Sequence, residues 1–363
     1  MKRLVVSGYH GFDNTGDEAI LQGLLQELRA AAGEIQEQVH FTVLSANPPK
    51  TSCSYGVDAI KRTNPIALLK AISQSRAVLS GGGGLLQDVT GRYTAAYYLA
   101  PCLLAFVLGK PFILYAHGIG PLRGKINRLL TRLVLNRAAC ITVRDEQSRQ
   151  LLQEIGVKKP ASLTADPAFC LKPQESDTTL ALIDALPLQK PRLALCLRPW
   201  PGLRLQKVAA AVNAFCRETG AAAVIIPFLP QTDLPLAQEL AKMLTCPLKI
   251  VEETLSPAEI MALMAEMDMV LAMRLHALIF ATAAGTAPVA ISYDPKVDSY
   301  MEQIGLRTAG RADSLSQANL LGELYYCWEH KKQLSRELSS AAGTFRKQAR
   351  QTARVTARLL ADL

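Results

Sequence analysis

The stretch that decides the fold runs from residue 269 to residue 285 and reads MVLAMRLHALIFATAAG. Its first five residues predict a buried strand, and its last nine, which end in a glycine, predict a helix. Arg274, Leu275 and His276 stand between them, where the first turn of a helix offers N–H groups to an anion. Arg274 adds a guanidinium suited to phosphate or carboxylate, and His276 can move a proton near neutral pH. The alternative is an ordinary strand-to-helix corner, with an arginine that reaches solvent and a histidine bonded to a carbonyl.

The same alternation of short β-rich runs and helical stretches continues along the whole chain. Strands are expected at residues 3–7, 40–44, 77–79, 111–116, 140–143, 162–164, 192–197, 222–227, 249–251, 269–273 and 287–291. Helical patterns lie between most of them, which predicts an α/β protein with parallel sheets covered on both faces. We expect two Rossmann-like doubly wound domains that face each other across a cleft at the carboxyl ends of their strands.

The expected domains follow from composition. Residues 1–175 form an N-terminal domain on the acceptor side, and residues 190–330 a C-terminal domain on the donor side. The polar, proline-containing segment 171–190 between them is expected to be a linker. Residues 331–363 form a basic amphipathic helix. It is expected to pack its apolar stripe back on the N-terminal domain, and its basic face could also lie near anionic lipid.

The charge of the chain argues against a nucleic-acid partner. The formal net charge is +9, and the last 33 residues hold eight basic and two acidic residues. Most of the basicity is therefore expected in this tail and not on a broad surface of the kind that binds DNA.

The cysteines and the apolar segments indicate a cytoplasmic protein. The eight cysteines are scattered, show no C-x-x-C pair and no zinc spacing, and are expected to be reduced. We expect no metal site and no cofactor. The longest apolar stretch, residues 95–116, is interrupted by two prolines, a glycine and a lysine, so a membrane span is not expected.

The loop after the first strand, residues 8–19, reads GYHGFDNTGDEA and is rich in glycine and carboxylates. Helix capping would explain Asn14 and Asp17. It does not require Asp13, Asp17 and Glu18 to crowd one turn. Like charges in a cleft raise the pKa of one carboxyl group, so this loop is a candidate for a general base.

Further loops follow the expected strands. Four glycines, residues 81–84, leave bare amides that could face an anion, although neither a P-loop nor a dinucleotide fingerprint is present. Arg144 could be a second anion clamp or could pair with Asp145 or Glu146 on the surface. Segments 198–200 and 293–296 follow strands of the second domain and share the edge of Arg274 if those strands are parallel.

Six segments in order resemble the polysaccharide pyruvyltransferases, most closely the bacterial CsaB type. They cover nearly the whole chain and lie at residues 8–19, 80–83, 117–121, 143–145, 165–168 and 274–276. The resemblance implies a glycosyltransferase type B-like fold and phosphoenolpyruvate as donor. It implies transfer of a pyruvyl group as a ketal onto two hydroxyls of one sugar. That sugar is expected to be N-acetylmannosamine in a lipid-linked cell-wall precursor at the inner face of the membrane.

The resemblance also suggests roles for residues. Arg274, Leu275, His276 and, less directly, Arg144 would bind the donor, together with the glycines of the second loop, Gly81, Gly82 and Gly83. The expected catalytic residues are His276 as the acid and Asp13 or Asp17 as the base. The expected acceptor-binding residues are Tyr9, Asn14, Glu18 and His117.

Two other functions are compatible with the sequence. A nucleotide-sugar-dependent glycosyltransferase of the same fold would place a diphosphate at the helix that begins near Arg274. A non-catalytic, membrane-associated glycan-binding module would depend on the basic tail. Only the pyruvyltransferase predicts phosphate release from phosphoenolpyruvate.

Overall fold

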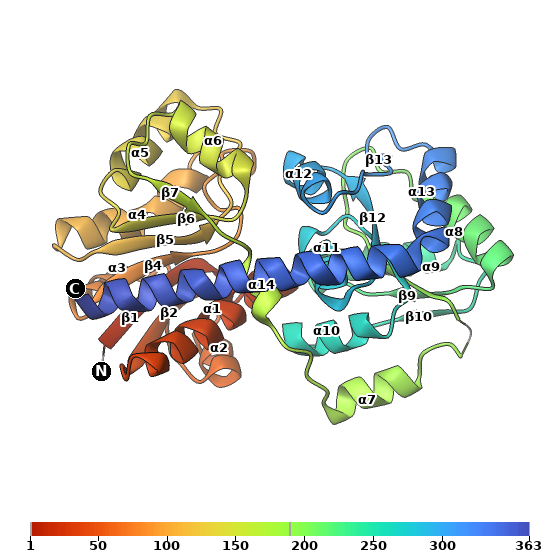
Figure 1. Ribbon diagram of the computed structural model, residues 1–363, viewed down its shortest axis with the longest axis horizontal. Helices are drawn as coiled ribbons and strands as arrows, with labels where there is room; N and C mark the ends of the chain where they lie inside the picture. Colours follow the sequence, from red (N-terminus) through yellow and green to blue (C-terminus); the bar gives the residue numbers. More distant parts are fainter. Residues whose placement is uncertain (1, 189, 363) are drawn as a thin grey trace. The chain divides into compact units, whose positions relative to one another are not determined.

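The computed structural model describes residues 2–188 and 190–362. The chain divides into two compact units, Met1–Leu171 with Phe345–Leu363 (unit 1) and Lys172–Thr344 (unit 2). Each unit has a parallel β-sheet with helices on both faces (Figure 1), which confirms the predicted class of two parallel-sheet α/β domains.

Unit 1 contains a seven-stranded sheet in the order β3-β2-β1-β4-β5-β6-β7. Its strands are β1 (Lys2–His10), β2 (Val39–Ser45), β3 (Asp58–Lys61), β4 (Ala77–Gly81), β5 (Phe112–His117), β6 (Cys140–Val143) and β7 (Ala161–Leu163). Its helices are α1 (Thr15–Glu34), α2 (Pro48–Tyr55), α3 (Pro65–Ser73), α4 (Thr94–Val107), α5 (Lys125–Leu135), α6 (Glu146–Glu154) and the 3-10 helix η1 (Pro167–Cys170).

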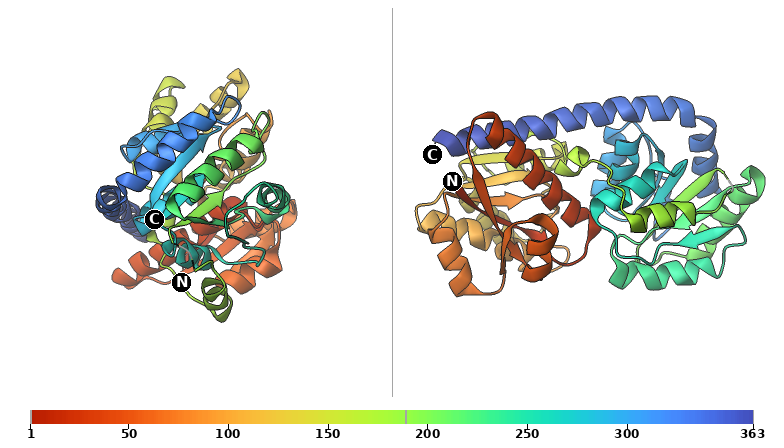
Figure 2. Two further views of the ribbon diagram at one scale, coloured as in Figure 1. Left: turned by 90° about the vertical axis from the view of Figure 1, so that its right-hand side faces the viewer. Right: turned by 90° about the horizontal axis from the view of Figure 1, so that it is seen from below.

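Two cores cover the faces of this sheet. One core takes residues from α3, α4, α5 and α6. The other takes four leucines of α1 together with Ala353, Ala357 and Leu360 of α14. In Figure 2, α14 (blue) runs along one side of unit 1 and α3 (orange) lies on the other.

Unit 2 contains a six-stranded parallel sheet in the order β10-β9-β8-β11-β12-β13. Its strands are β8 (Arg192–Cys196), β9 (Ala222–Ile225), β10 (Leu248–Ile250), β11 (Met269–Ala272), β12 (Ala287–Ser292) and β13 (Gly310–Arg311). Its helices are α7 (Asp177–Asp184), α8 (Leu205–Thr219), α9 (Pro230–Ala241), α10 (Pro257–Ala265), α11 (Leu275–Ala284), α12 (Pro295–Gln303) and α13 (Gln317–Glu329). The last helix, α14 (Lys331–Asp362), begins in unit 2 and continues into unit 1.

The β11–α11 corner forms as its sequence predicts. All four residues of β11 are buried, and the cap residue Gly285 adopts the left-handed conformation (φ 71°) that ends α11. The expected linker, in contrast, contains a helix. Ser176 caps α7 by accepting a hydrogen bond from the Thr179 backbone N–H, and this helix belongs to unit 2.

The apolar stripe of α14 packs on protein along its length. Its buried residues are Leu334, Leu338, Ala342, Phe345, Ala349, Ala353, Ala357 and Leu360. In unit 1, Lys2 Nζ donates to the Leu360 carbonyl at 2.8 Å, which ties the helix to β1. No helix of the described residues is both long and apolar enough to cross a membrane.

The close approach of α1 to η1 gives a test of packing in unit 1. A Cβ at Gly23 would lie 2.3 Å from the Pro167 carbonyl oxygen, whereas a Cβ at Gly33 of the same helix meets nothing within 4 Å. Gly23→Ala should lower the free energy of unfolding by about 1–3 kcal/mol through overpacking. Gly33→Ala should raise it by about 0.4–1 kcal/mol, because alanine restricts the unfolded chain. Urea denaturation of both variants measures this contrast, and equal effects would contradict it.

Candidate active site

Two arginines share the carboxyl edge of the unit 2 sheet. Strands β8 and β11 pair in parallel with Cys196 opposite Ala272, and Arg198 and Arg274 each lie two residues beyond this pair. Adjacent strands are about 4.8 Å apart. The two backbone positions are therefore neighbours at the end of the sheet where α/β proteins bind ligands.

A buried carboxylate fixes the Arg274 side chain. Arg274 Nε donates to Asp233 Oδ2 at 3.0 Å, and Nη2 donates to Asp233 Oδ1 in a short contact, which makes the pair bidentate. Asp233 is 2 % exposed and also accepts hydrogen bonds from the backbone N–H groups of Phe228 and Leu229. The guanidinium plane of Arg274 is thus set by a carboxylate that is itself fixed by the first turn of α9.

The N-terminus of α11 follows directly. Arg274 is its N-cap residue, and no side chain caps the helix. Leu275 is buried in the core, so it can meet a ligand through its backbone only. His276 lies half-buried in the first turn. The three residues singled out in the sequence therefore place a cation, backbone N–H groups and an imidazole at one helix end.

Arg198 is the residue of this edge to which the sequence assigned no role. Its Nε is buried without a hydrogen-bond partner in the structure. Its guanidinium carbon lies 4.6 Å from the ring centroid of Tyr293 and 5.4 Å from that of Trp200. Because the aromatic rings hold the cation by their faces, its N–H groups are left for an anion. Its place two residues past a strand was the only sequence signal.

In unit 1, the first loop is held by its own side chains. Asn14 caps α1 by accepting from the Gly16 N–H, and Asp13 pairs with Lys50 at 2.7 Å. Glu18 accepts from the Gly11 N–H and from the Tyr55 hydroxyl, both at 2.7 Å. The carboxyl group with a raised pKa in this loop is Glu18, chiefly because it is buried. Asp13, Asn14 and Glu18 thus each have a structural contact.

Tyr9 and Asp17 occupy other parts of this loop. The Tyr9 ring stacks on Phe12 with centroids 4.1 Å apart. Asp17 lies in the first turn of α1. Its Oδ1 is 2.9 Å from the position that a Cβ on Gly83 would take, so Asp17 faces the second glycine loop.

The glycines of that second loop are needed for packing. Gly82 and Gly83 have φ of 57° and 78°, and a Cβ on Gly82 would lie 2.0 Å from Ile20. A Cβ on Gly81 would lie 2.8 Å from Leu24. All three glycines are buried. A tight turn packed on α1, which is the ordinary alternative to a ligand-binding loop, therefore explains why these positions are glycines.

Two neutral histidines lie beneath this loop. His10 is 1 % exposed, both its ring nitrogens lack hydrogen-bond partners in the structure, and burial with the nearby Arg62 lowers its pKa to about 3. His117 is fully buried, its Nε2 lies 3.1 Å from Ser80 Oγ, and burial lowers its pKa to about 4. A fully buried His117 does not present its ring to a ligand in this conformation.

Arg144 also pairs with a buried carboxylate. Its Nη1 donates to Asp166 Oδ2 at 2.8 Å, and its contact with Asp145 is longer, 3.7 Å. Arg144 is 8 % exposed, so the alternative of a surface ion pair is wrong. A Cβ on Gly118 would lie 2.9 Å from Arg144 Nε, so the absent side chain lets the guanidinium pack against the loop after β5.

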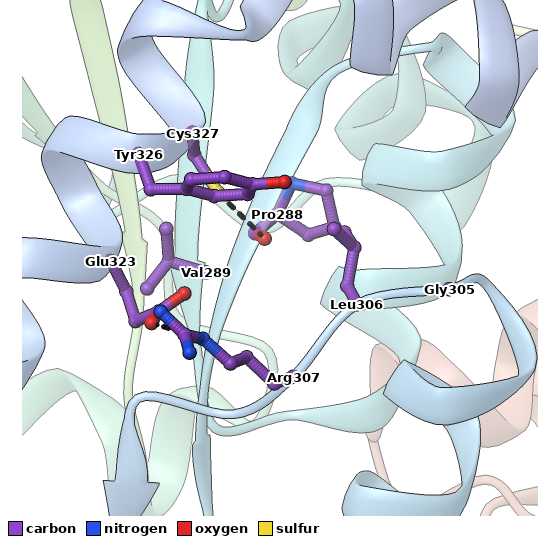
Figure 3. Close-up of a pocket in the computed structure, with 8 residues that line it drawn as sticks. All are labelled: Pro288, Val289, Gly305, Leu306, Arg307, Glu323, Tyr326 and Cys327. Carbon is purple, nitrogen blue, oxygen red and sulfur yellow. Dashed lines mark hydrogen bonds and ion pairs between the residues drawn. The ribbon is translucent and has the colours of Figure 1, made fainter.

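A cavity of about 440 Å³ opens elsewhere in unit 2 (Figure 3). It is lined by Pro288 and Val289 near the start of β12, with Tyr326 and Cys327 of α13. Arg307 pairs with Glu323 at 2.6 Å on its wall. Arg274 lies beyond the opposite end of the parallel strands. This cavity is therefore separate from the sheet edge that carries Arg198 and Arg274, which we call the arginine edge. Among the described residues, no group of three or more His, Cys, Asp or Glu side chains could hold a metal ion.

The comparisons with solved structures agree with this architecture. MnaA of S. aureus in complex with UDP has a TM-score of 0.65 and 13% identity, with 95% of this chain and 92% of that chain covered. HepE of Anabaena in complex with UDP and glucose has a TM-score of 0.67 and 14% identity, with both chains covered completely. The UDP-GlcNAc 2-epimerase of Neisseria meningitidis bound to UDP-GlcNAc has a TM-score of 0.64 and 14% identity over both complete chains. No curated protein sequence matches.

The two parallel-sheet units give the chain a fold of the glycosyltransferase B-like class. The chain belongs to the polysaccharide pyruvyl transferase family, which it matches over residues 14–295. This match confirms the family and the kind of enzyme that the six sequence segments predict. It covers most of both sheets, including β11 and the whole of α11.

The pairing of Arg274 with Asp233 can be tested by its effect on stability. Asp233→Asn leaves a buried guanidinium without a carboxylate and should lower the free energy of unfolding by about 3–5 kcal/mol. Asp294→Asn is the matched control, because Asp294 caps α12 and its pair with Lys296 is longer, 3.5 Å. It should change stability by less than about 1 kcal/mol. Removing both partners, Asp233→Asn with Arg274→Met, should recover part of the loss; a double variant less stable than Asp233→Asn would exclude this account.

The buried histidines predict how stability depends on pH. Their folded pKa values, about 3 and about 4, lie below the ordinary histidine pKa of 6.5. As the pH falls below 6.5 the unfolded chain binds protons first, so each histidine lowers stability by up to about 1.4 kcal/mol per pH unit. His117→Gln should reduce this slope between pH 6.5 and 4, and His40→Gln, at a partly exposed site, serves as the control. Urea denaturation at several pH values measures it, and an unchanged slope in His117→Gln would contradict the prediction.

Proposed function

We propose that this enzyme transfers the pyruvyl group of phosphoenolpyruvate to two hydroxyls of one sugar and releases phosphate. The family supports pyruvyl transfer to a polysaccharide acceptor. The arginine edge of unit 2 carries the choice of donor, because phosphoenolpyruvate has two anionic groups and Arg198 and Arg274 are neighbours there. We propose a lipid-linked cell-wall precursor as acceptor, with N-acetylmannosamine as the modified sugar.

In the proposed complex, the phosphate or the carboxylate of the donor lies at the uncapped N-terminus of α11. Arg274 meets it with a guanidinium that Asp233 has already oriented, so less conformational freedom is lost on binding. Arg198, with its unpartnered Nε, takes the second anionic group. Arg144 remains a further candidate for binding the donor. Its guanidinium already donates to Asp166 and would have to bind the donor as well.

His276 is proposed to be the general acid. It gives a proton to the methylene carbon of phosphoenolpyruvate, while a sugar hydroxyl attacks the adjacent carbon and loses its proton to a base. Loss of phosphate then leaves an oxocarbenium-like carbon, which the second hydroxyl attacks with loss of its own proton to complete the ketal. Asp17 is the favoured base, because the carboxylate of Asp13 is already paired with the ammonium of Lys50.

The remaining residues of the first loop are proposed to shape the acceptor site. The stacked rings of Tyr9 and Phe12 offer an apolar face to a sugar ring. Asn14 and Glu18 hold the loop in place. All eight cysteines are free, which supports the cytoplasm as the compartment, at the inner face of the membrane. The proposal includes no metal, cofactor or nucleic acid.

Phosphate release from phosphoenolpyruvate with lipid-linked disaccharide acceptors tests the proposal. His276→Gln should reduce kcat by a factor of about 10²–10⁴ and leave protection from thermal unfolding by phosphoenolpyruvate intact. Arg274→Lys should instead raise KM for phosphoenolpyruvate, because a lysine cannot make the bidentate pair with Asp233 that orients the cation. Full activity of His276→Gln would exclude the acid role.

A nucleotide-sugar donor remains the second candidate, because MnaA, HepE and the epimerase are each described in complex with UDP or a UDP-sugar. It predicts thermal protection by UDP and none by phosphoenolpyruvate. That result, with no phosphate release on any acceptor, would replace the proposed donor. A non-catalytic glycan-binding module would show neither activity.

A further inference from the structure

Helix α5 exposes much of its apolar face. Ile126, Leu129 and Leu133 are 76 %, 47 % and 56 % exposed. Asn127 and Thr131 of the same helix are buried. The exposed residues follow a three- and four-residue spacing, so they form one stripe along the surface of the helix. A helix that only covers a sheet turns such a stripe inward.

A basic stripe runs beside the apolar one. Lys125, Arg128 and Arg132 are exposed and have the same three- and four-residue spacing. Helix α5 contains no acidic residue. An apolar stripe bordered by lysine and arginine is typical of a helix that lies in the interface of a membrane.

The neighbouring helix α4 extends this surface. Its exposed apolar side chains are Tyr97, Leu103, Phe106 and Val107, and Tyr93 precedes its first residue. Arg137, just after α5, lies 5.3 Å from the Phe106 ring centroid, and Arg92 lies 5.0 Å from that of Tyr93. We call these exposed residues of α4 and α5, with their flanking arginines, the α4–α5 surface. Tyrosines beside basic groups are enriched where proteins meet lipid headgroups.

The α4–α5 surface stands out from the rest of the described chain. Of sixteen large hydrophobic side chains that are exposed among the described residues, eleven lie between residues 66 and 133. Helix α3 adds two of them, Ile66 and Leu69. Single exposed hydrophobic residues are normal, but a group of this size indicates an interaction surface.

The charge of the segment indicates an anionic partner. Residues 61–137 contain eleven lysines and arginines and one acidic residue, Asp88. Asp88 is used internally, because it accepts hydrogen bonds from the backbone N–H groups of Arg123 and Gly124. The expectation that most of the basicity belongs to the tail is therefore wrong. The excess charge of this segment exceeds the net charge of the whole chain, and acidic residues elsewhere offset it.

Four of the eight basic residues of α14 have, in contrast, a partner within their own unit. Arg350 and Arg354 pair with Glu27 and Glu34 of α1, and Arg346 donates to the Phe169 carbonyl. Lys331 pairs with Asp268 in unit 2. These partners reduce the field that α14 presents to an anionic surface.

We propose that the α4–α5 surface docks unit 1 on a bilayer that contains anionic phospholipid. Ile126, Leu129 and Leu133 enter the boundary between headgroups and acyl chains, and Lys125, Arg128 and Arg132 meet the lipid phosphates. This inference deepens the proposed function, because a lipid-linked acceptor lies at such a surface. Its test reads vesicle binding alone, so a negative result would leave the donor chemistry untouched.

Sedimentation of the full chain with phosphatidylcholine vesicles, with and without phosphatidylglycerol, tests the proposal. We expect binding that requires phosphatidylglycerol and weakens as salt is added. Lys125→Gln with Arg132→Gln should weaken it about twenty-five-fold, because each basic residue near an anionic membrane contributes about a factor of five. Ile126→Ser with Leu133→Ser should weaken the vesicle binding that remains at high salt, because burial of apolar side chains carries the binding there.

The matched control is Lys332→Gln with Arg336→Gln, which removes the same charge from exposed positions of α14. It should bind vesicles like the unchanged chain, and a loss equal to that of the α5 variant would overturn the proposal. Absence of binding at every lipid composition would overturn it as well. So would a dimer that Ile126→Ser with Leu133→Ser converts to a monomer, since the surface would then belong to a second copy. Circular dichroism of each variant establishes that it is folded.

Discussion

The site in unit 2 depends on one interaction, the bidentate pair between Arg274 and Asp233. A guanidinium at the end of a sheet can adopt many rotamers, and a buried one requires a counter-charge. Asp233 supplies that charge from the first turn of α9 and is itself held by two backbone N–H groups. The cation is thereby fixed beside the N-terminus of α11. The imidazole of His276 follows two residues later, in the first turn of the same helix.

Unit 1 uses the same device with different surroundings. Arg144 is bound to Asp166, and the loop between β5 and α5 contributes a glycine against which the guanidinium packs. In the same unit, His10 and His117 are neutral because burial disfavours their charged forms. The positive charge of this region is therefore concentrated on arginines, which do not titrate in the physiological range, so its electrostatics are insensitive to pH near neutrality.

The elements of the fold that the sequence predicts best are those with strong local signals. Strand β11 is a continuous apolar run, and Gly285 can take the left-handed conformation that ends α11. Strand β3 has only four residues, none of them fully buried, so its sequence contains no apolar run that would predict a strand. Helix α7 lies in a polar segment that resembles a linker in composition.

For the site, sequence reasoning finds Arg274 and His276 because they interrupt an apolar pattern. It cannot find Asp233, which lies 41 residues earlier in the chain and reads as an ordinary acidic residue near the start of a helix. The orientation of α5 is equally hidden. Periodicity shows that a helix has an apolar side, but only the packing of Asn127 and Thr131 shows that much of this side faces away from the core.

The division of unit 1 between two parts of the chain has a consequence for biosynthesis. Residues 345–362 supply Ala353, Ala357 and Leu360 to the core beneath α1, yet they are translated after the whole of unit 2. During synthesis the earlier part of unit 1 must therefore wait, with the part of its core that Ala353, Ala357 and Leu360 complete left open, while some 170 residues of unit 2 emerge and begin to fold. The apolar residues of this incomplete core are a target for chaperones during that interval.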